Sequence, residues 1–106
     1  MLRGENFPLA LESFEKLIDK APNFAKAHYG RAMILYKRNK FKESEQAMLA
    51  ILRKNKIYAR GYWILASSLY KQGRNSEAFV QCKAGLEIDP LDEHLWKLLF
   101  SINQCP

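Results

Sequence analysis

The sequence predicts an all-α fold, an α-solenoid of antiparallel helix pairs with about six helices. Two observations support this prediction. The residue pattern repeats with a period of 34 positions along the 106-residue chain. Within each half of a period, apolar residues recur at helical spacing and end at a turn residue or a proline. A fixed period of this length is typical of stacked two-helix units that bury their apolar faces against one another.

The clearest unit is Ala59–Asp92, in which a glycine-containing turn separates two helical stretches. A shift of 34 residues towards the N-terminus places it on Ala25–Tyr58, and the same shift towards the C-terminus aligns Tyr62 with Trp96. The equivalent positions form these columns: His28/Tyr62/Trp96, Ala32/Ala66/Phe100, Leu35/Leu69, Ala10/Ser44/Ala78, Phe14/Met48/Cys82 and Leu17/Ile51/Gly85. Agreement over this many columns indicates true repeats.

The best copy reads Tyr62-x2-Leu65-Ala66-x2-Leu69, then Ala78-x3-Cys82, then Pro90. It resembles the tetratricopeptide repeat (TPR) family, whose pattern is W-x2-L-G-x2-Y, then A-x3-F, then P. The resemblance covers nearly the whole chain, and the departures only change residue size within packing columns. It implies a right-handed superhelix, a concave face lined by the first helix of each unit, and a function in protein binding.

The chain is expected to form one domain with a half repeat (1–24), two full repeats (25–58 and 59–92) and a C-terminal capping helix (93–103). Met1–Arg3 would end a preceding helix, and Gly4–Phe7 would form a turn. Pro8 suits the first turn of the next helix, because its missing N–H has no intrahelical partner there. Helices are predicted over Leu9–Lys20, Ala25–Arg38, Phe41–Lys54, Ala59–Gln72, Ser76–Ile88 and Glu93–Asn103.

The turns follow the same period. Asn39 and Gly73 are suited to the left-handed conformation that closes the first helix of each full unit. Ser76 is a candidate cap for the helix that follows Gly73. Pro22 closes the half repeat and Pro90 the last full one, whereas Asn55 and Lys56 replace the proline between them, which makes that boundary less sharp.

The two ends of the stack are expected to differ. Trp96 and Leu99 should bury against Ala78–Ile88, and the polar tail of the last helix should face solvent, as a capping helix requires. At the front, the helix that carries Phe14 lacks a sister helix, so part of its face should be exposed. Either the chain is a piece of a longer array, or this open N-terminal end is an edge for self-association.

The sequence shows no pattern for catalysis, a cofactor or a metal site. The two histidines lie 66 residues apart, and His28 takes a core ring position. The pairs Glu43/Glu45 and Glu87/Asp89 are expected to be solvated surface. No stretch is long and apolar enough for a membrane span. With Cys82 in a core column and Cys105 near the end, a disulfide is not expected, which favours a reduced, cytoplasmic setting.

Charge is distributed unevenly along the chain. Lys20–Arg74 holds 13 Lys/Arg but only two acids, Glu43 and Glu45, a balance of +11. The rest of the chain holds four basic residues and nine acids, which gives −5 and recovers the overall +6. Ala25–Arg38 and Ala59–Gln72 contain no acid, so the concave face implied by the resemblance should be basic.

Aromatic and basic side chains off the packing stripe are therefore the candidate peptide-binding residues, because rings supply contact area and cations attract an acidic partner. They are Lys26, Tyr29, Met33, Tyr36, Lys37, Arg60, Trp63, Ser67, Tyr70, Lys71, His94 and Lys97. The leading hypothesis is a protein-interaction module whose basic and aromatic concave groove binds a peptide segment rich in Asp and Glu.

Two alternatives stay open. Exposed rings on a basic surface also suit single-stranded RNA or DNA, and the chain could be a structural spacer within a larger protein. Some members of the family clamp the terminal carboxylate of chaperone tails with Lys and Asn on the first helices. The matching pairs here, Tyr29/Met33 and Trp63/Ser67, lack that chemistry, and Arg60 is the one matching cation, so such a clamp is not expected.

Overall fold

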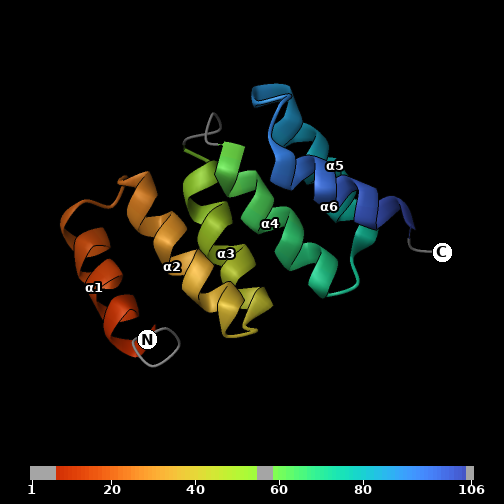
Figure 1. Cartoon of the computed structure of the whole chain (residues 1–106). Helices are drawn as coiled ribbons and strands as arrows, with labels where there is room; N and C mark the ends of the chain where they lie inside the picture. Colours follow the sequence, from red (N-terminus) through yellow and green to blue (C-terminus); the bar gives the residue numbers. More distant parts are fainter. Residues whose placement is uncertain (1–6, 55–58, 105–106) are drawn as a thin grey trace.

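The computed structural model describes residues 7–54 and 59–104, and the side chains of all of these except Phe7 and Gln104. The described residues form six helices: α1 (Phe7–Lys20), α2 (Ala25–Lys37), α3 (Phe41–Leu52), α4 (Ala59–Lys71), α5 (Asn75–Ile88) and α6 (Glu93–Gln104). They follow one another from one end of the molecule to the other (Figure 1). The all-α prediction is confirmed, and every helix begins and ends within two residues of its predicted bounds. None of these helices has the length and apolar character needed to cross a membrane.

Several expectations fall outside the described residues. These are the helix end at Met1–Arg3, most of the turn at Gly4–Phe7, the boundary at Asn55 and Lys56, and Cys105.

The helices form two layers. In the first layer α2 contacts α4 and α4 contacts α6; in the second, the described residues of α1, α3 and α5 contact first-layer helices but not one another. The helices of the first layer therefore lie closer to one another than those of the second, and the stack curves with the first layer on its inner side. We call the exposed side of α2, α4 and α6 the inner face; it is the front of the molecule in Figure 1.

The turns inside the two full units have the same geometry. Asn39 (φ 65°) and Gly73 (φ 81°) both adopt the left-handed conformation, as predicted. One residue further on, the Lys40 N–H donates to Leu35 O at 2.8 Å and the Arg74 N–H to Leu69 O at 3.0 Å. These bonds satisfy carbonyls that a helix end leaves unpaired.

The cap predicted at Ser76 is wrong, because α5 begins at Asn75 and no side chain of the described residues caps it. Arg74 precedes the helix instead and donates hydrogen bonds to Glu77 at 2.6 Å and to Glu45 of α3 at 2.8 Å. The hydrogen bond from Arg74 lowers the pKa of Glu77. Glu45 was expected on the solvated surface, but it is buried. The cation of Arg74, together with a 3.0 Å hydrogen bond from Gln72, compensates its burial.

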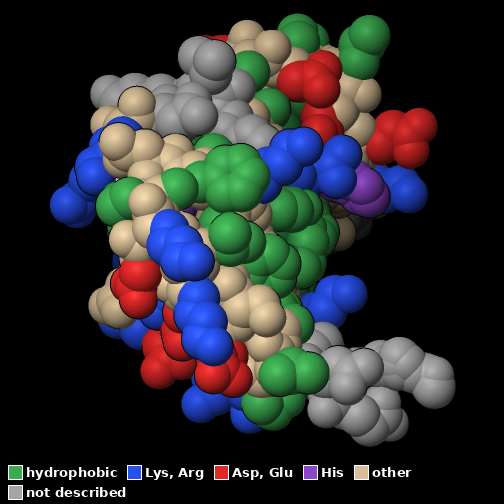
Figure 2. Space-filling model, turned by 90° about the vertical axis from the view of Figure 1, so that its left-hand side faces the viewer, with side chains coloured by type: hydrophobic (Ala, Val, Ile, Leu, Met, Phe, Trp, Pro, Cys, Tyr) green, Lys and Arg blue, Asp and Glu red, His purple; other side chains and the backbone are tan. Residues whose placement is uncertain are grey.

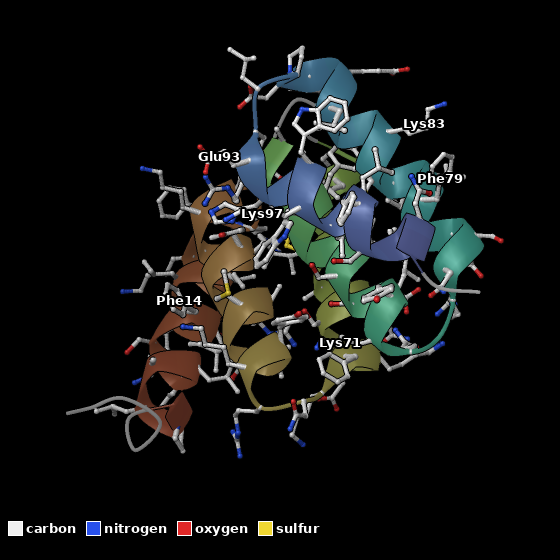
Figure 3. All side chains as sticks on the ribbon, turned by 45° about the vertical axis from the view of Figure 1, so that its right-hand side comes forward. Phe14, Lys71, Phe79, Lys83, Glu93 and Lys97 are labelled. Carbon is white, nitrogen blue, oxygen red and sulfur yellow. The ribbon has the colours of Figure 1, made fainter. Side chains whose placement is uncertain are left out.

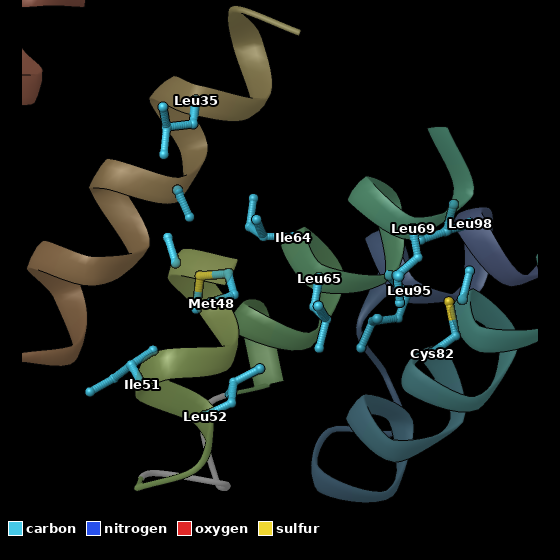
Figure 4. Packing of buried hydrophobic residues seen from close by; sticks show 14 of the residues in the cluster. Leu35, Met48, Ile51, Leu52, Ile64, Leu65, Leu69, Cys82, Leu95 and Leu98 are labelled. Carbon is cyan, nitrogen blue, oxygen red and sulfur yellow. The ribbon is translucent and has the colours of Figure 1, made fainter. Parts of the chain in front are cut away.

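One apolar core runs through α2 to α6. Figure 4 shows Met48 and Ile51 of α3 near Ile64 and Leu65 of α4, with Cys82 of α5 beyond them. All five side chains are buried. Burial raises the pKa of the Cys82 thiol to about 11, because an apolar surrounding disfavours the thiolate.

The last helix is anchored by residues that were not predicted as its anchors. Leu95 and Leu98 are buried in the core, and the Leu95 N–H donates to the Asp92 carboxylate at 3.0 Å, so Asp92 is the N-cap of α6. The prediction that Trp96 buries against α5 is wrong, because 51% of its surface is exposed. Leu99 is half-buried. The column of Trp96 packs against the second helix of its own unit, and no such helix follows α6 among the described residues.

At the other end, α1 packs on α2 through Phe14. A Cβ added at Gly30 would lie 2.5 Å from Cζ of Phe14, so the end of the ring abuts the glycine and needs its lack of a side chain. Phe14 is half-buried. Leu17 remains 42% exposed, which agrees with the expectation of an incompletely covered front helix.

Candidate functional site

The inner face carries a hollow of about 270 Å³ between α2, α4 and α6. We call it the inner-face hollow. Its lining consists of Tyr36, Trp63, Ser67, Tyr70, Lys71, His94, Lys97, Leu98 and Ser101. The 34-residue register explains this set, because equivalent positions on consecutive first helices lie side by side. Trp63 and Lys97, for example, are 34 positions apart.

Aromatic rings form a continuous row across the hollow. Trp63 lies between Tyr36 and His94, with ring centroids 6.0 Å and 5.4 Å away. Tyr36 in turn meets Phe41 edge-on at 5.3 Å. Such contacts favour particular relative orientations of the rings. The hollow therefore has an aromatic floor whose rings contact one another.

Positive charge borders this floor. Within the described residues, Lys71 and Lys97 line the hollow and form no ion pair. Figure 3 shows Lys97 on the side of α6 that faces α2 and α4, whereas Phe79 and Lys83 of α5 lie on the far side. Figure 2 shows the inner face edge-on at the right, where Lys and Arg side chains and a histidine stand beside hydrophobic ones.

The basic field is weaker at Arg60 than the sequence suggested. Its guanidinium lies 3.8 Å from the carboxylate of Asp92, at the start of α6. The sequence prediction rested on the acids of the first helices alone, and this acid comes from the turn that precedes α6. An acidic ligand would therefore meet the ammonium groups of Lys71 and Lys97, which form no ion pair within the described residues. Glu93 lies one turn before Lys97 on α6, and the charge of Arg60 is partly compensated by Asp92.

The structure brings seven of the twelve candidate residues together in the inner-face hollow: Tyr36, Trp63, Ser67, Tyr70, Lys71, His94 and Lys97. The other five do not line it: Lys26, Tyr29, Met33, Lys37 and Arg60. Four of them lie on α2, and Arg60 of α4 pairs with Asp92 at the start of α6. Sequence reasoning missed Leu98 and Phe41. Leu98 is 34 positions after the buried Ile64, and this equivalence could have predicted that Leu98 packs beneath the hollow. No repeat position predicts the contact of Phe41 with Tyr36.

A second hollow, of about 450 Å³, lies between α1, α2 and α3 and is lined by His28, Arg31 and Glu15 among others. His28 is buried, as predicted, and its Nε2 lies 2.7 Å from Pro22 O, to which it donates when neutral with Nδ1 unprotonated. Its Nδ1 has no hydrogen-bond partner among the residues that the structure describes. The described part of the chain contains no group of three or more His, Cys, Asp or Glu that could hold a metal ion.

Comparisons with known proteins agree with this architecture. A sequence profile described as tetratricopeptide repeat matches residues 2–56 and 35–93. No match is found among curated proteins.

Three solved structures are close in fold but only distantly related in sequence. The first TPR of Spaghetti (RPAP3), bound to the HSP90 peptide SRMEEVD, has a TM-score of 0.90 at 20% identity over 94% of this chain and 79% of that one. The second TPR domain of human RPAP3, in complex with the HSP70 peptide SGPTIEEVD, has a TM-score of 0.87 at 19% identity, over 93% of this chain and 82% of that one. The TPR2B domain of yeast Sti1, in its complex with pHsp70, has a TM-score of 0.86 at 20% identity, over 94% of this chain and 85% of that one. Because the repeat profile matches most of the sequence, and the helix pairs stack as that profile requires, the chain belongs to the tetratricopeptide repeat family.

Proposed function

We propose that this chain is a protein-interaction module that binds a peptide segment in the inner-face hollow. The ligand carries Asp or Glu side chains and at least one large apolar side chain. The observation that carries this proposal is the row of Tyr36, Trp63 and His94, with Lys71 and Lys97 beside it. Rigid rings offer contact area at low entropic cost, and cations favour an acidic partner.

The volume of the hollow limits what it can take. About 270 Å³ holds a large side chain with its neighbouring backbone, not a folded domain. The apolar side chain would lie on Trp63, next to Leu98, and the acidic groups would pair with Lys71 and Lys97. Two of the three helices that border the hollow, α2 and α4, contain no acid and therefore do not repel a carboxylate. The third, α6, has Glu93 in its first turn.

The related structures support a peptide ligand. The HSP90 and HSP70 peptides bound in two of those structures, SRMEEVD and SGPTIEEVD, are acidic at the C-terminal end. In this chain Tyr29, Met33, Trp63 and Ser67 stand where a carboxylate clamp would need cations and amides. The proposed ligand is therefore an acidic segment with an apolar anchor, rather than a terminal carboxylate held by a clamp. Its setting is a reducing compartment such as the cytoplasm, in keeping with the buried free thiol of Cys82.

The test selects ligands from random sequences, so the natural partner need not be identified first. A random library of 12-residue peptides is selected on the chain, and the winners are measured by fluorescence anisotropy. We expect acidic winners with an aromatic or large aliphatic residue. Trp63→Ala should weaken binding at least tenfold, mainly through faster dissociation. Lys71→Ala/Lys97→Ala should slow association and flatten its salt dependence.

Phe100→Ala and Lys83→Ala are matched controls for an exposed ring and an exposed cation outside the hollow. If they weaken binding as much as the hollow variants do, the site is misplaced. A single-stranded oligonucleotide serves as the competing probe. If it binds more tightly than any peptide, with an affinity that falls steeply as salt rises, the chain is a nucleic-acid-binding repeat. The absence of any selected ligand would favour a structural spacer.

A further inference from the structure

The two ends of the stack expose faces that are buried in its middle. Ala32 and Ala66 are completely buried, whereas Phe100, in the same column of α6, is 66% exposed. On α1, Leu17 is 42% exposed, whereas Ile51 in its column is 1% exposed. The exposed face of α6 is thus equivalent to the face by which α2 and α4 pack against the second helix of their own unit. The exposed face of α1 is equivalent to the face by which α3 and α5 pack against the first helix of theirs.

Contacts within the units show that these two faces fit each other. In the first full unit, Ser44 Oγ of α3 donates to Ala32 O of α2 at 2.8 Å. In the second, a Cβ added at Gly85 of α5 would lie 2.9 Å from Tyr62 Cβ of α4. In the 34-residue register, Ala32 is equivalent to Phe100 and Ser44 to Ala10, whereas Tyr62 is equivalent to Trp96 and Gly85 to Leu17. The positions of Phe100 and Trp96 are therefore ones that contact the positions of Ala10 and Leu17 within a unit. No helix of the described residues covers either open face.

From this register we infer that two copies of the chain associate head to tail, with α6 of one copy on α1 of the next. Phe100 would lie over Ala10, and Trp96 over Leu17. This contact repeats in trans the packing of α4 on α5, and it goes beyond the proposed peptide site because it uses the opposite side of α6.

The chemistry of the two faces supports this pairing. Trp96 and Phe100 are large and project from α6, and the Trp96 Nε1–H donates to Pro90 O at 2.6 Å, which fixes the indole. The α1 face is small, with Ala10 and Ser13 beside Leu17. Phe100 thus meets the small Ala10, whereas Trp96 meets the apolar side chain of Leu17. Because Phe100 replaces an alanine, the helices cannot approach as closely as α4 and α5 do, so the contact should be weak and reversible.

A head-to-tail contact joins two different surfaces, so each copy keeps one free α1 and one free α6. Assembly is therefore open-ended. The average mass of the 106-residue chain should rise continuously with concentration in sedimentation velocity, from micromolar to millimolar, instead of stopping at a dimer.

The decisive experiment uses two blocked variants. Leu17→Glu places a charge on the α1 face and Phe100→Glu on the α6 face; both side chains are exposed, so folding should be retained and is checked by circular dichroism. Each variant alone should be monomeric, with association weakened at least tenfold. An equimolar mixture should form a 1:1 dimer through the intact α6 of the first variant and the intact α1 of the second.

Leu9→Glu and Leu91→Glu are the matched controls, because Leu9 and Leu91 are more exposed than Leu17 and lie outside both faces. They should associate like the wild type. A wild type that stays monomeric at millimolar concentration overturns the inference. So does a Leu17→Glu chain that dimerises by itself, which would mean that α6 pairs with α6, or a mixture that stays monomeric. Should either Glu variant unfold, Ser13→Glu on the exposed α1 face or Trp96→Glu on the exposed α6 face replaces it, with the same three outcomes.

Discussion

α4 and α6 hold the same place in consecutive repeats but have different surroundings. α4 is covered by α5 on one side and flanked by α2 and α6, so its column residues Leu65 and Ala66 are buried. α6 has neighbours on one side only among the described residues, and the equivalent Leu99 and Phe100 stay partly or largely exposed. Equivalent repeat positions are therefore buried to the same extent only where the same neighbouring helices are present.

The same comparison separates two chemistries. Trp63 of α4 faces the inner hollow beside lysines, whereas Trp96 of α6 faces outwards among apolar side chains that include Leu86 and Leu99. Lys97 follows Trp96 in the sequence, yet it points to the inner hollow. α6 therefore contributes Lys97 to the basic inner-face hollow and Trp96 to an apolar surface on its other side.

The largest expected effect is on stability at equivalent leucines. Leu65→Ala removes a fully buried side chain and should lower the free energy of unfolding by about 2–5 kcal/mol. Leu99→Ala, in the same column, should cost less than about 1.5 kcal/mol because the leucine is already half-exposed. Urea denaturation of both variants at low protein concentration measures the difference. Equal losses would mean that α6 is covered as fully as α4.

Next comes the glycine at which α4 and α6 meet on α5. A Cβ at Gly85 would lie 2.9 Å from Tyr62 Cβ and 2.8 Å from Leu95 Cδ1. Gly85→Leu should therefore destabilise the fold by about 1–3 kcal/mol through overpacking. Gly85→Ala is milder, because better helix propensity offsets part of the crowding. The measurement is the same urea titration, and a Gly85→Leu chain as stable as the wild type would contradict close packing at this point.

The cover of α5 over α4 also predicts the reactivity of Cys82. With its pKa raised to about 11 by burial, the thiol is almost entirely protonated at pH 8, and the thiolate is the reactive species. In a Cys105→Ser chain, modification by an aromatic disulfide reagent should be slow in buffer and fast in urea. Raising the pH from 8 towards 11 should speed the reaction as the thiolate forms. Rapid modification at pH 8 without denaturant would show that α5 does not cover the core as described.

Much of the fold could be predicted from the sequence, because it depends on local signals that repeat. Asn39 and Gly73 share a column and adopt the same left-handed turn, and the small column of Ala66 marks where helices approach closely. For the candidate site, the shared column of Tyr29, Trp63 and Lys97 predicted that the three residues line one wall. Trp63 and Lys97 line the inner-face hollow, whereas Tyr29 does not.

The rest depended on contacts that no periodic pattern records. The pairing of Arg60 with Asp92 joins a first helix to a turn 32 positions away, and the burial of Glu45 depends on Arg74 from the next unit. The exposure of Trp96 follows from a missing neighbour rather than from its own column. Such features arise from the ends and junctions of the stack, where the repeat rule no longer applies.

The central claim is that ligand binds at Trp63 and not at Trp96, and single-tryptophan chains test it most directly. Trp96→Phe leaves only Trp63 to fluoresce, and Trp63→Phe leaves only Trp96. Upon titration with a selected acidic peptide, the emission of Trp63 should shift and its quenching by iodide should fall, while the signal of Trp96 stays unchanged. A response confined to Trp96 would contradict the inner-face site.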